Sequence, residues 1–403
     1  MIRPGAGLLV VFLALGSAFS APAARKNPAE VRALWVECEG SNDTLSSKKK
    51  IDELIERARA ARVNLLYVQL LRHNRAWFNS RLADSSPYRA FLRKEQTDPL
   101  LYLLARAHQA GIQVHAWLNV FRIGKDRNAP ILRQLGADAV TRDGTGRSLL
   151  DYPVDELPDG GYWLEPGDRR VTRYLQETIQ ELLRKYPDLD GIHLDFVRYP
   201  YASPHGGSLW AGRRDFGYGA QSVERFREWT GLDPLKMELN RANCQAWDNW
   251  RRFQVNTFVE SVTALARAIR PSLTVSAAVV AWADRAYLAA FQDWRRWLEE
   301  GLLDAVAVMN YSTDSRVARY LSRAAVLAGQ GKRQVYVGIG EYLLGSKRSE
   351  LFAQLDDARR AGADGIVFFS YDSMAARPDI FPLLGSSRFS PPAVVPPMPW
   401  KGK

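Results

Sequence analysis

The sequence predicts a closed (β/α)8 barrel, the TIM-barrel fold of the α/β class. Short β-type runs alternate with longer amphipathic helical runs along most of the 403 residues, and this alternation favours a parallel sheet. Eight successive strand–helix units indicate a closed barrel rather than an open sheet. No glycine-rich dinucleotide loop follows the first strand, so a nucleotide-binding fold is disfavoured.

The expected strands are short runs rich in β-branched and aromatic residues. They cover residues 32–37, 64–69, 113–119, 191–199, 273–280, 305–311, 334–340 and 365–371. The expected helices repeat apolar residues at helical spacing. They cover residues 47–61, 98–111, 171–186, 249–269, 287–301, 316–329 and 348–362. The loops after the third and fourth strands, 120–170 and 200–245, are long, as substrate-binding insertions on a barrel often are.

The two ends of the chain differ from this central barrel, which we assign to residues 25–385. Residues 1–24 combine Arg3, an apolar stretch and small residues, which is the pattern of a cleavable signal peptide. We therefore expect an exported protein, periplasmic or secreted, without stable membrane insertion after cleavage. Residues 386–403 are rich in proline, and we expect an extended, flexible tail.

The formal charge is +11, which favours acidic partners such as an anionic polymer. The arginines are scattered through helices and form no compact basic arm, so we do not expect a nucleic-acid partner. Export permits a disulfide between Cys38 and Cys244, but two buried thiols are an equal alternative.

An aspartate inside the fourth strand identifies the candidate active site. Asp195 lies near the end of the run "DGIHLDFVRYP", and barrel enzymes carry their catalytic residues at the C-terminal ends of strands. Arg198 follows closely and is expected to favour the ionised carboxylate, so Asp195 would act as nucleophile or base. For the proton donor we rank Glu341 first, then Asp372 and then Glu37.

Further side chains at the strand ends are expected to bind substrate. Carboxylates and amides bind sugar hydroxyls, and aromatic rings pack on sugar faces. The candidates are Trp35, Glu37, Gln69, Arg72, Trp117, Asn119, His193, Arg198, Tyr199, Trp282, Asn310, Tyr311 and Tyr371.

Several of these segments together resemble a known family. The runs "RALWVE", "NLLYVQ", "VHAWLNV", "DGIHLDFVRYP" and "GIVFFSYDS" are similar to those of the bacterial glycosyl-hydrolase-like family ten, whose members are exported (β/α)8 barrels. The resemblance covers roughly residues 31–375. It implies hydrolysis of a bacterial polysaccharide, namely peptidoglycan glycan strands stripped of their peptides, and it places the family aspartate at Asp195 and its arginine at Arg198.

Two other functions remain open at this stage. A barrel without a proton donor would bind a glycan and not cleave it. His73, His115 and His193 would suit a metal-dependent polysaccharide deacetylase if they converged, but no zinc-binding spacing is present. We expect neither a metal nor another cofactor.

Overall fold

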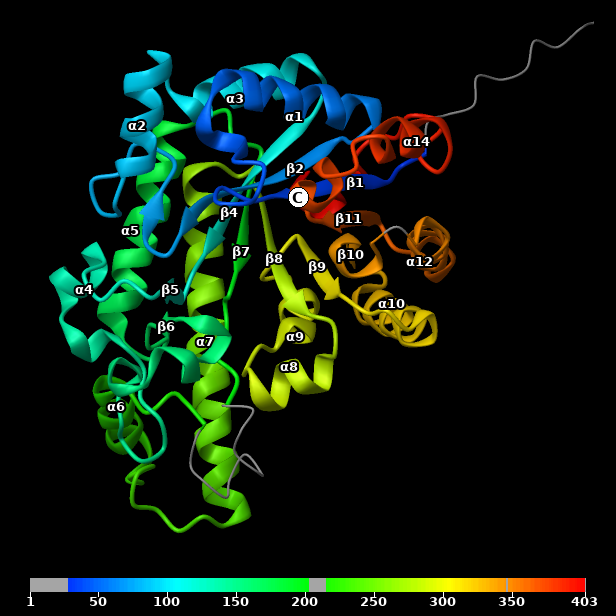
Figure 1. The fold of residues 1–403 in the computed structure, drawn as a ribbon. Coiled ribbons are helices and arrows are strands. Elements are labelled where there is room, and N and C mark those ends of the chain that lie inside the picture. Colours follow the sequence, from blue (N-terminus) through cyan, green and yellow to red (C-terminus); the bar gives the residue numbers. More distant parts are fainter. Residues whose placement is uncertain (1–27, 203–214, 346, 403) are drawn as a thin grey trace, which may run out of the picture.

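The computed structural model describes residues 28–202, 215–345 and 347–402 and confirms the closed (β/α)8 barrel. Figure 1 shows the strands gathered at the centre, with helices around them. The predicted signal peptide lies outside the described residues. None of the helices that the structure describes is long and apolar enough to cross a membrane.

Eight parallel strands form the barrel. They are β1 (Val31–Val36), β2 (Leu65–Arg72), β4 (Gln113–Asn119), β7 (Gly191–Asp195), β8 (Thr274–Val280), β9 (Ala305–Asn310), β10 (Gln334–Gly340) and β11 (Gly365–Phe369). They pair in chain order, and β1 closes the ring by pairing with both β2 and β11. The short β3 (Arg75–Ala76) forms a hairpin with β2, and β5 (Arg122–Gly124) pairs with β6 (Tyr162–Trp163) above the barrel.

The helices lie outside the ring of strands. They are α1 (Lys48–Ala60), α2 (Ser86–Glu95), α3 (Pro99–Gln109), α4 (Pro130–Leu135), α5 (Arg169–Lys185), α6 (Ala220–Thr230), α7 (Arg241–Ile269), α8 (Ala283–Ala289), α9 (Trp294–Glu299), α10 (Ser315–Gly329), α11 (Glu341–Leu344), α12 (Arg348–Ala361), α13 (Tyr371–Ala375) and α14 (Ile380–Ser386). Side-chain caps start several of them; the Asp98 carboxylate, for example, accepts from the Leu100 and Leu101 amides at the start of α3.

Alternation along the strands creates two apolar cores. On β1, Leu34 and Val36 pack outward against the helices, whereas Ala33 and Trp35 point into the barrel. The Trp35 indole approaches Gly338 so closely that a Cβ there would lie 2.7 Å from the ring. The inner core therefore needs a glycine on β10 to accommodate this tryptophan.

Several predicted elements have different boundaries in the structure, and two of these differences coincide with a residue of positive φ. The fourth strand ends at Asp195, not at Tyr199, because Phe196 adopts a positive φ of 51° that a strand cannot continue. The single helix expected over 287–301 is two helices, α8 and α9. Phe291, with a φ of 53°, lies in the turn between them.

Cys38 is a buried free thiol, so it does not form a disulfide with Cys244. Burial raises the pKa of this thiol well above its ordinary value, which disfavours the reactive thiolate. Of the two alternatives drawn from the sequence, the structure contains the unpaired thiol at Cys38.

The C-terminal segment packs against the barrel, although its composition predicts a free, extended tail. The Val394 amide donates to the Pro28 carbonyl at 3.0 Å. Gln334 Nε2 donates to the carbonyls of Pro396 and Pro397 at 3.2 and 3.1 Å, and Trp400 Nε1 donates to Asp304 Oδ1 at 2.9 Å. The segment thus covers the N-terminal end of the barrel near β9 and β10.

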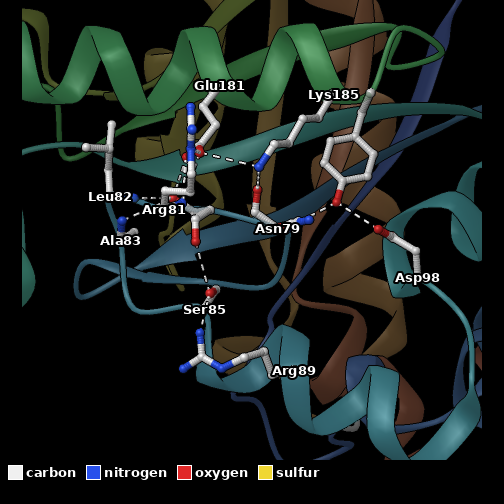
Figure 2. Close-up of polar contacts among 11 residues, drawn as sticks. Asn79, Arg81, Leu82, Ala83, Ser85, Arg89, Asp98, Glu181 and Lys185 are labelled. Carbon is white, nitrogen blue, oxygen red and sulfur yellow. Dashed lines mark hydrogen bonds and ion pairs between the residues drawn. The ribbon is translucent and has the colours of Figure 1, made fainter.

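Polar contacts also fasten the segment after β3 to α5, as Figure 2 shows. Glu181 of α5 accepts from Ser80 Oγ at 2.7 Å and from the Arg81 amide at 2.9 Å. The Tyr186 hydroxyl accepts from the Asn79 amide at 3.0 Å and donates to Asp98 Oδ2 at 2.9 Å. These bonds join the second and third strand–helix units.

Trp400→Phe is expected to lower the free energy of unfolding by about 1–2 kcal/mol, because it removes one hydrogen bond to the buried Asp304 carboxylate. Urea denaturation of the parent and the variant measures this difference. Trp229→Phe is the matched control, because Trp229 is 71% exposed and surface substitutions change stability by less than about 0.5 kcal/mol. Equal midpoints for Trp400→Phe and the parent would show that the hydrogen bond from Trp400 to Asp304 contributes nothing to stability.

Candidate active site

A cavity of about 440 Å³ opens at the C-terminal ends of the strands. Its lining combines aromatic, cationic, carboxylate and amide side chains. These are Trp35, Glu37, Gln69, Arg72, Trp117, Asn119, Arg122, Asp159, Asp195, Phe196, Arg198, Ala278, Met309, Tyr311, Tyr342 and Phe369. The cavity is therefore at the end of the barrel where catalytic residues are expected.

Asp195 is the last residue of β7 and is only 7% exposed. The Trp117 indole donates from Nε1 to Asp195 Oδ2 at 3.0 Å, and the Phe196 amide donates to Oδ1 at 2.7 Å. Both oxygens are thus held in place, one by the neighbouring strand β4 and the other by the turn that ends β7.

Burial raises the pKa of Asp195 above its ordinary value, although the Phe196 and Trp117 hydrogen bonds and the charges of Arg198 and Arg122 all act to lower it. The sequence led us to expect that Arg198 would keep Asp195 ionised. In the structure Arg198 instead pairs with Asp159, whose Oδ2 lies 3.0 Å from Nη2. Desolvation therefore outweighs the arginine, and Asp195 suits the role of proton donor rather than that of base.

Glu37 supplies a second carboxylate from the end of β1, three strands away from β7 around the barrel. Its Oε2 accepts from Ser370 Oγ at 3.0 Å, and its Oε1 lies 3.7 Å from Arg72 Nη1. Its side chain is 22% exposed. This carboxylate therefore has a cationic partner and access to solvent.

The charges of both carboxylates act on the Tyr311 phenol. Burial raises its pKa well above the ordinary value, and the charges of Asp195 and Glu37 raise it further. Its ring also stacks on Phe369 with centroids 5.4 Å apart. Tyr311, Phe369 and Tyr342 form what we call the aromatic wall, which faces the same cavity as the two carboxyl groups.

Three arginines of the cavity form what we call the cationic wall: Arg72, Arg122 and Arg198. Arg72 lies near Glu37 and also donates from Nη1 to Gln69 Oε1 at 3.2 Å. Gln69 in turn donates from Nε2 to Asn119 Oδ1 at 3.2 Å. The predicted amides on β2 and β4 are thus linked to each other and to this wall.

Two of the three predicted catalytic acids lie outside the cavity lining. Glu341 begins α11 and is paired with Arg377. Asp372 lies in α13, where its Oδ1 accepts from the Asn42 amide at 2.7 Å, and burial followed by the charge of Glu37 raises its pKa. Of the ranked donors, only Glu37 lines the cavity.

Five predicted substrate-binding residues also lie outside the lining. His193 is in the barrel interior beneath the cavity, where it accepts from Trp35 Nε1 at 3.1 Å. The Tyr199 hydroxyl donates to Glu165 at 2.9 Å, and the Tyr371 hydroxyl accepts from Arg57 at 3.0 Å. Asn310 donates outward to the Ala318 carbonyl at 2.7 Å, and Trp282 is 47% exposed beside Tyr320.

Sequence reasoning missed Arg122, Asp159, Phe196, Ala278, Met309, Tyr342 and Phe369 in the lining. Alternation could have found Met309 and Phe369, because residues at every second position of β9 and β11 point inward. Arg122 and Asp159 belong to the long loop after β4, which carries no periodic signal.

The histidines have separate environments. His73 contacts Arg122 Nη1 through Nε2 at 2.8 Å, and burial followed by the charge of Arg122 lowers its pKa to about 4. His115 is buried in the barrel, where burial lowers its pKa to about 3. Within the described ranges, no three His, Cys, Asp or Glu side chains are grouped as a metal site.

This fold and this carboxylate-bearing cavity define the class of (β/α)8 barrels to which many glycosidases belong. The family model described as Glycosyl hydrolase-like 10 matches residues 30–349, and the chain belongs to that family.

Curated relatives are also named as glycosyl hydrolases. The chain is 28% identical over 269 residues to Glycosyl hydrolase DigH of Escherichia coli strain K12, a match that covers 62% of this chain and 55% of that protein. Thus the chain spans about half the length of this relative. It is 24% identical to Glycosyl hydrolase YngK of Bacillus subtilis strain 168, over 92% of this chain and 74% of the relative.

Solved structures of similar fold include the catalytic domain of a β-amylase from Paenibacillus polymyxa. That domain matches with a TM-score of 0.57 and 13% identity, over 86% of this chain and 94% of the other. A β-galactosidase from the psychrophilic Marinomonas ef1 also has a TM-score of 0.57, with 9% identity, over 85% of this chain and 54% of the other. At such identities the likeness supports the barrel fold alone.

Asp195→Asn is expected to gain stability relative to the parent as the pH rises. Burial raises the pKa of Asp195 above its ordinary 3.8, so near that pH the folded chain holds a proton that the unfolded chain releases. The parent therefore loses stability as the pH rises from 3.8 through the raised folded pKa. The side-chain amide of the Asp195→Asn variant does not ionise, so the variant does not lose stability in this way.

Denaturant unfolding of the parent and Asp195→Asn between about pH 3 and pH 8 measures the difference. A difference in favour of the variant that shrinks as the pH rises would mean that the folded pKa is depressed, contrary to this account.

Proposed function

We propose that the protein is an exported glycoside hydrolase that cleaves the glycan strands of peptidoglycan. The observation that carries this proposal is the pair of carboxyl groups in one cavity: Asp195, whose pKa burial raises, and Glu37, which is ion-paired. Glycoside hydrolysis needs one protonated and one ionised carboxyl group on the two sides of the scissile bond.

In this mechanism Asp195 donates its proton to the glycosidic oxygen as the bond to the anomeric carbon breaks. In one route Glu37 attacks the anomeric carbon, and water then hydrolyses the glycosyl-enzyme while Asp195 takes a proton from that water. In the other route Glu37 removes a proton from the water that attacks the anomeric carbon directly. Tyr311, close to both carboxylates, lies where it can donate a hydrogen bond to the reacting sugar.

Other features of the chain support a polysaccharide substrate. The aromatic wall offers flat rings to the apolar faces of sugars, and the linked amides Gln69 and Asn119 offer hydrogen bonds to hydroxyl groups. Two curated relatives are named glycosyl hydrolases. The signal-peptide pattern of residues 1–24 and the resemblance described above support export and a peptidoglycan substrate.

Asp195→Asn and Glu37→Gln are each expected to reduce turnover of peptide-free peptidoglycan strands by about 100- to 10,000-fold, since each removes one partner of the acid–base pair. Mass spectrometry of products formed in water enriched in oxygen-18 measures the reaction. Hydrolysis places the label at the new reducing end.

The matched control is Glu156→Gln, an exposed carboxylate in the loop after β4, which should leave turnover unchanged. Retained turnover in Asp195→Asn would remove Asp195 from the mechanism. Binding of strands by the parent without turnover would indicate a glycan-binding barrel, and release of acetate without chain cleavage would indicate a deacetylase.

A further inference from the structure

The three arginines of the cationic wall differ in their direct ion pairs. Arg198 pairs with Asp159 at 3.0 Å, and Arg72 lies within 3.7 Å of Glu37 and 3.4 Å of Glu39. Arg122 forms no ion pair with any carboxylate among the residues that the structure describes. The hydrogen-bond partners of the Arg122 guanidinium are neutral. Nε donates to the Asp159 carbonyl at 3.0 Å, and Nη1 lies 2.8 Å from His73 Nε2.

Both neutral acceptors hold the Arg122 guanidinium in a fixed position. The His73 ring packs against Gly124 so closely that a Cβ there would lie 2.6 Å from it, and the guanidinium carbon lies 5.3 Å from the centre of the Phe196 ring. His73 remains neutral at ordinary pH, because burial and the neighbouring arginines lower its pKa to about 4. The site therefore holds Arg122 with no carboxylate of the described residues in direct contact; the charge of Asp159 acts on it, but the Asp159 carboxylate pairs directly with Arg198.

The Arg122 guanidinium lies in the same cavity as the two carboxyl groups proposed to react. Arg122 lines the same cavity as Asp195 and Glu37, and its charge acts on Asp195. Burial lowers the pKa of Arg122 itself, so an anion brought by the substrate would stabilise the charged guanidinium. An arginine fork also matches the geometry of a carboxylate.

We propose that Arg122 binds a carboxylate carried by a sugar beside the scissile bond and thereby makes the cavity selective for acidic glycans. This inference rests on the proposed function and names the substrate class of the same site. Muramic acid would bring such a group through its lactyl carboxylate, and a uronic acid would bring it through the carboxylate at C6.

The test compares binding of two forms of one ligand in the Asp195→Asn background, where the reduced turnover leaves the ligand intact during the titration. The ligands are peptide-free muramyl oligosaccharides with free carboxylates and the same oligosaccharides with the carboxylates converted to methylamides. Titration calorimetry is expected to show about 10- to 100-fold tighter binding of the free form, the range expected for one charge-assisted contact. Addition of Arg122→Gln should remove this preference.

The matched control is Arg127→Gln, in the same loop but outside the cavity lining, where Arg127 Nε donates to the Tyr162 hydroxyl at 2.9 Å. This variant should keep the full preference. Oligoglucuronate is the second ligand: tighter binding of it than of the muramyl form, again dependent on Arg122, would identify a uronic acid as the source of the carboxylate. Weaker binding would identify muramic acid.

Equal affinity for the free and methylamide forms, no binding of any of these ligands, or the same preference after Arg122→Gln would overturn the inference. Failure of the proposed function has a different result. The parent would then cleave neither form, whereas equal cleavage of both forms would contradict only the role of Arg122.

Discussion

The burial of one carboxyl group at the end of β7 is the constraint on which the site depends. The inward face of β7 carries His193 and then Asp195, so the acid lies directly above a filled barrel interior. The strand must end there, because Phe196 adopts a positive φ of 51° and its amide turns back to Asp195 Oδ1. Burial then outweighs every neighbouring donor and cation and raises the pKa of Asp195.

The rest of the cavity complements this buried acid. Glu37 sits three strands away with an arginine and a serine as partners. One carboxyl group is thus buried, whereas the other is ion-paired and partly exposed. Acid–base catalysis by two carboxyl groups needs them to lie in different environments. The aromatic wall and the cationic wall then provide contacts for the faces and for the charge of a sugar, while Gly338 leaves the space that Trp35 fills below them.

The alternation of inward and outward side chains along the strands predicted much of the cavity lining from the sequence. The prediction failed at residues where the regular strand had ended or the side chain points outward. It placed Trp35, Gln69, Trp117, Asn119 and Asp195 on inward faces, and all five line the cavity. Asn310 occupies a position of β9 whose side chain points outward, toward α10. Tyr371 lies beyond the end of β11 at Phe369, and its hydroxyl contacts Arg57 of α1. The raised pKa of Asp195 and the position of Arg122 depend on burial and on an irregular loop, neither of which has a sequence period.

The protonation of Asp195 is the central claim, and a carbon-13 NMR titration of its side-chain carboxyl measures it directly. The Asp195→Asn variant assigns the signal. We predict a midpoint above the ordinary value of 3.8, because the buried carboxyl keeps its proton longer than a solvated one. A midpoint below that value would show that Arg198 and Arg122 dominate, and Asp195 would then be the base and not the proton donor.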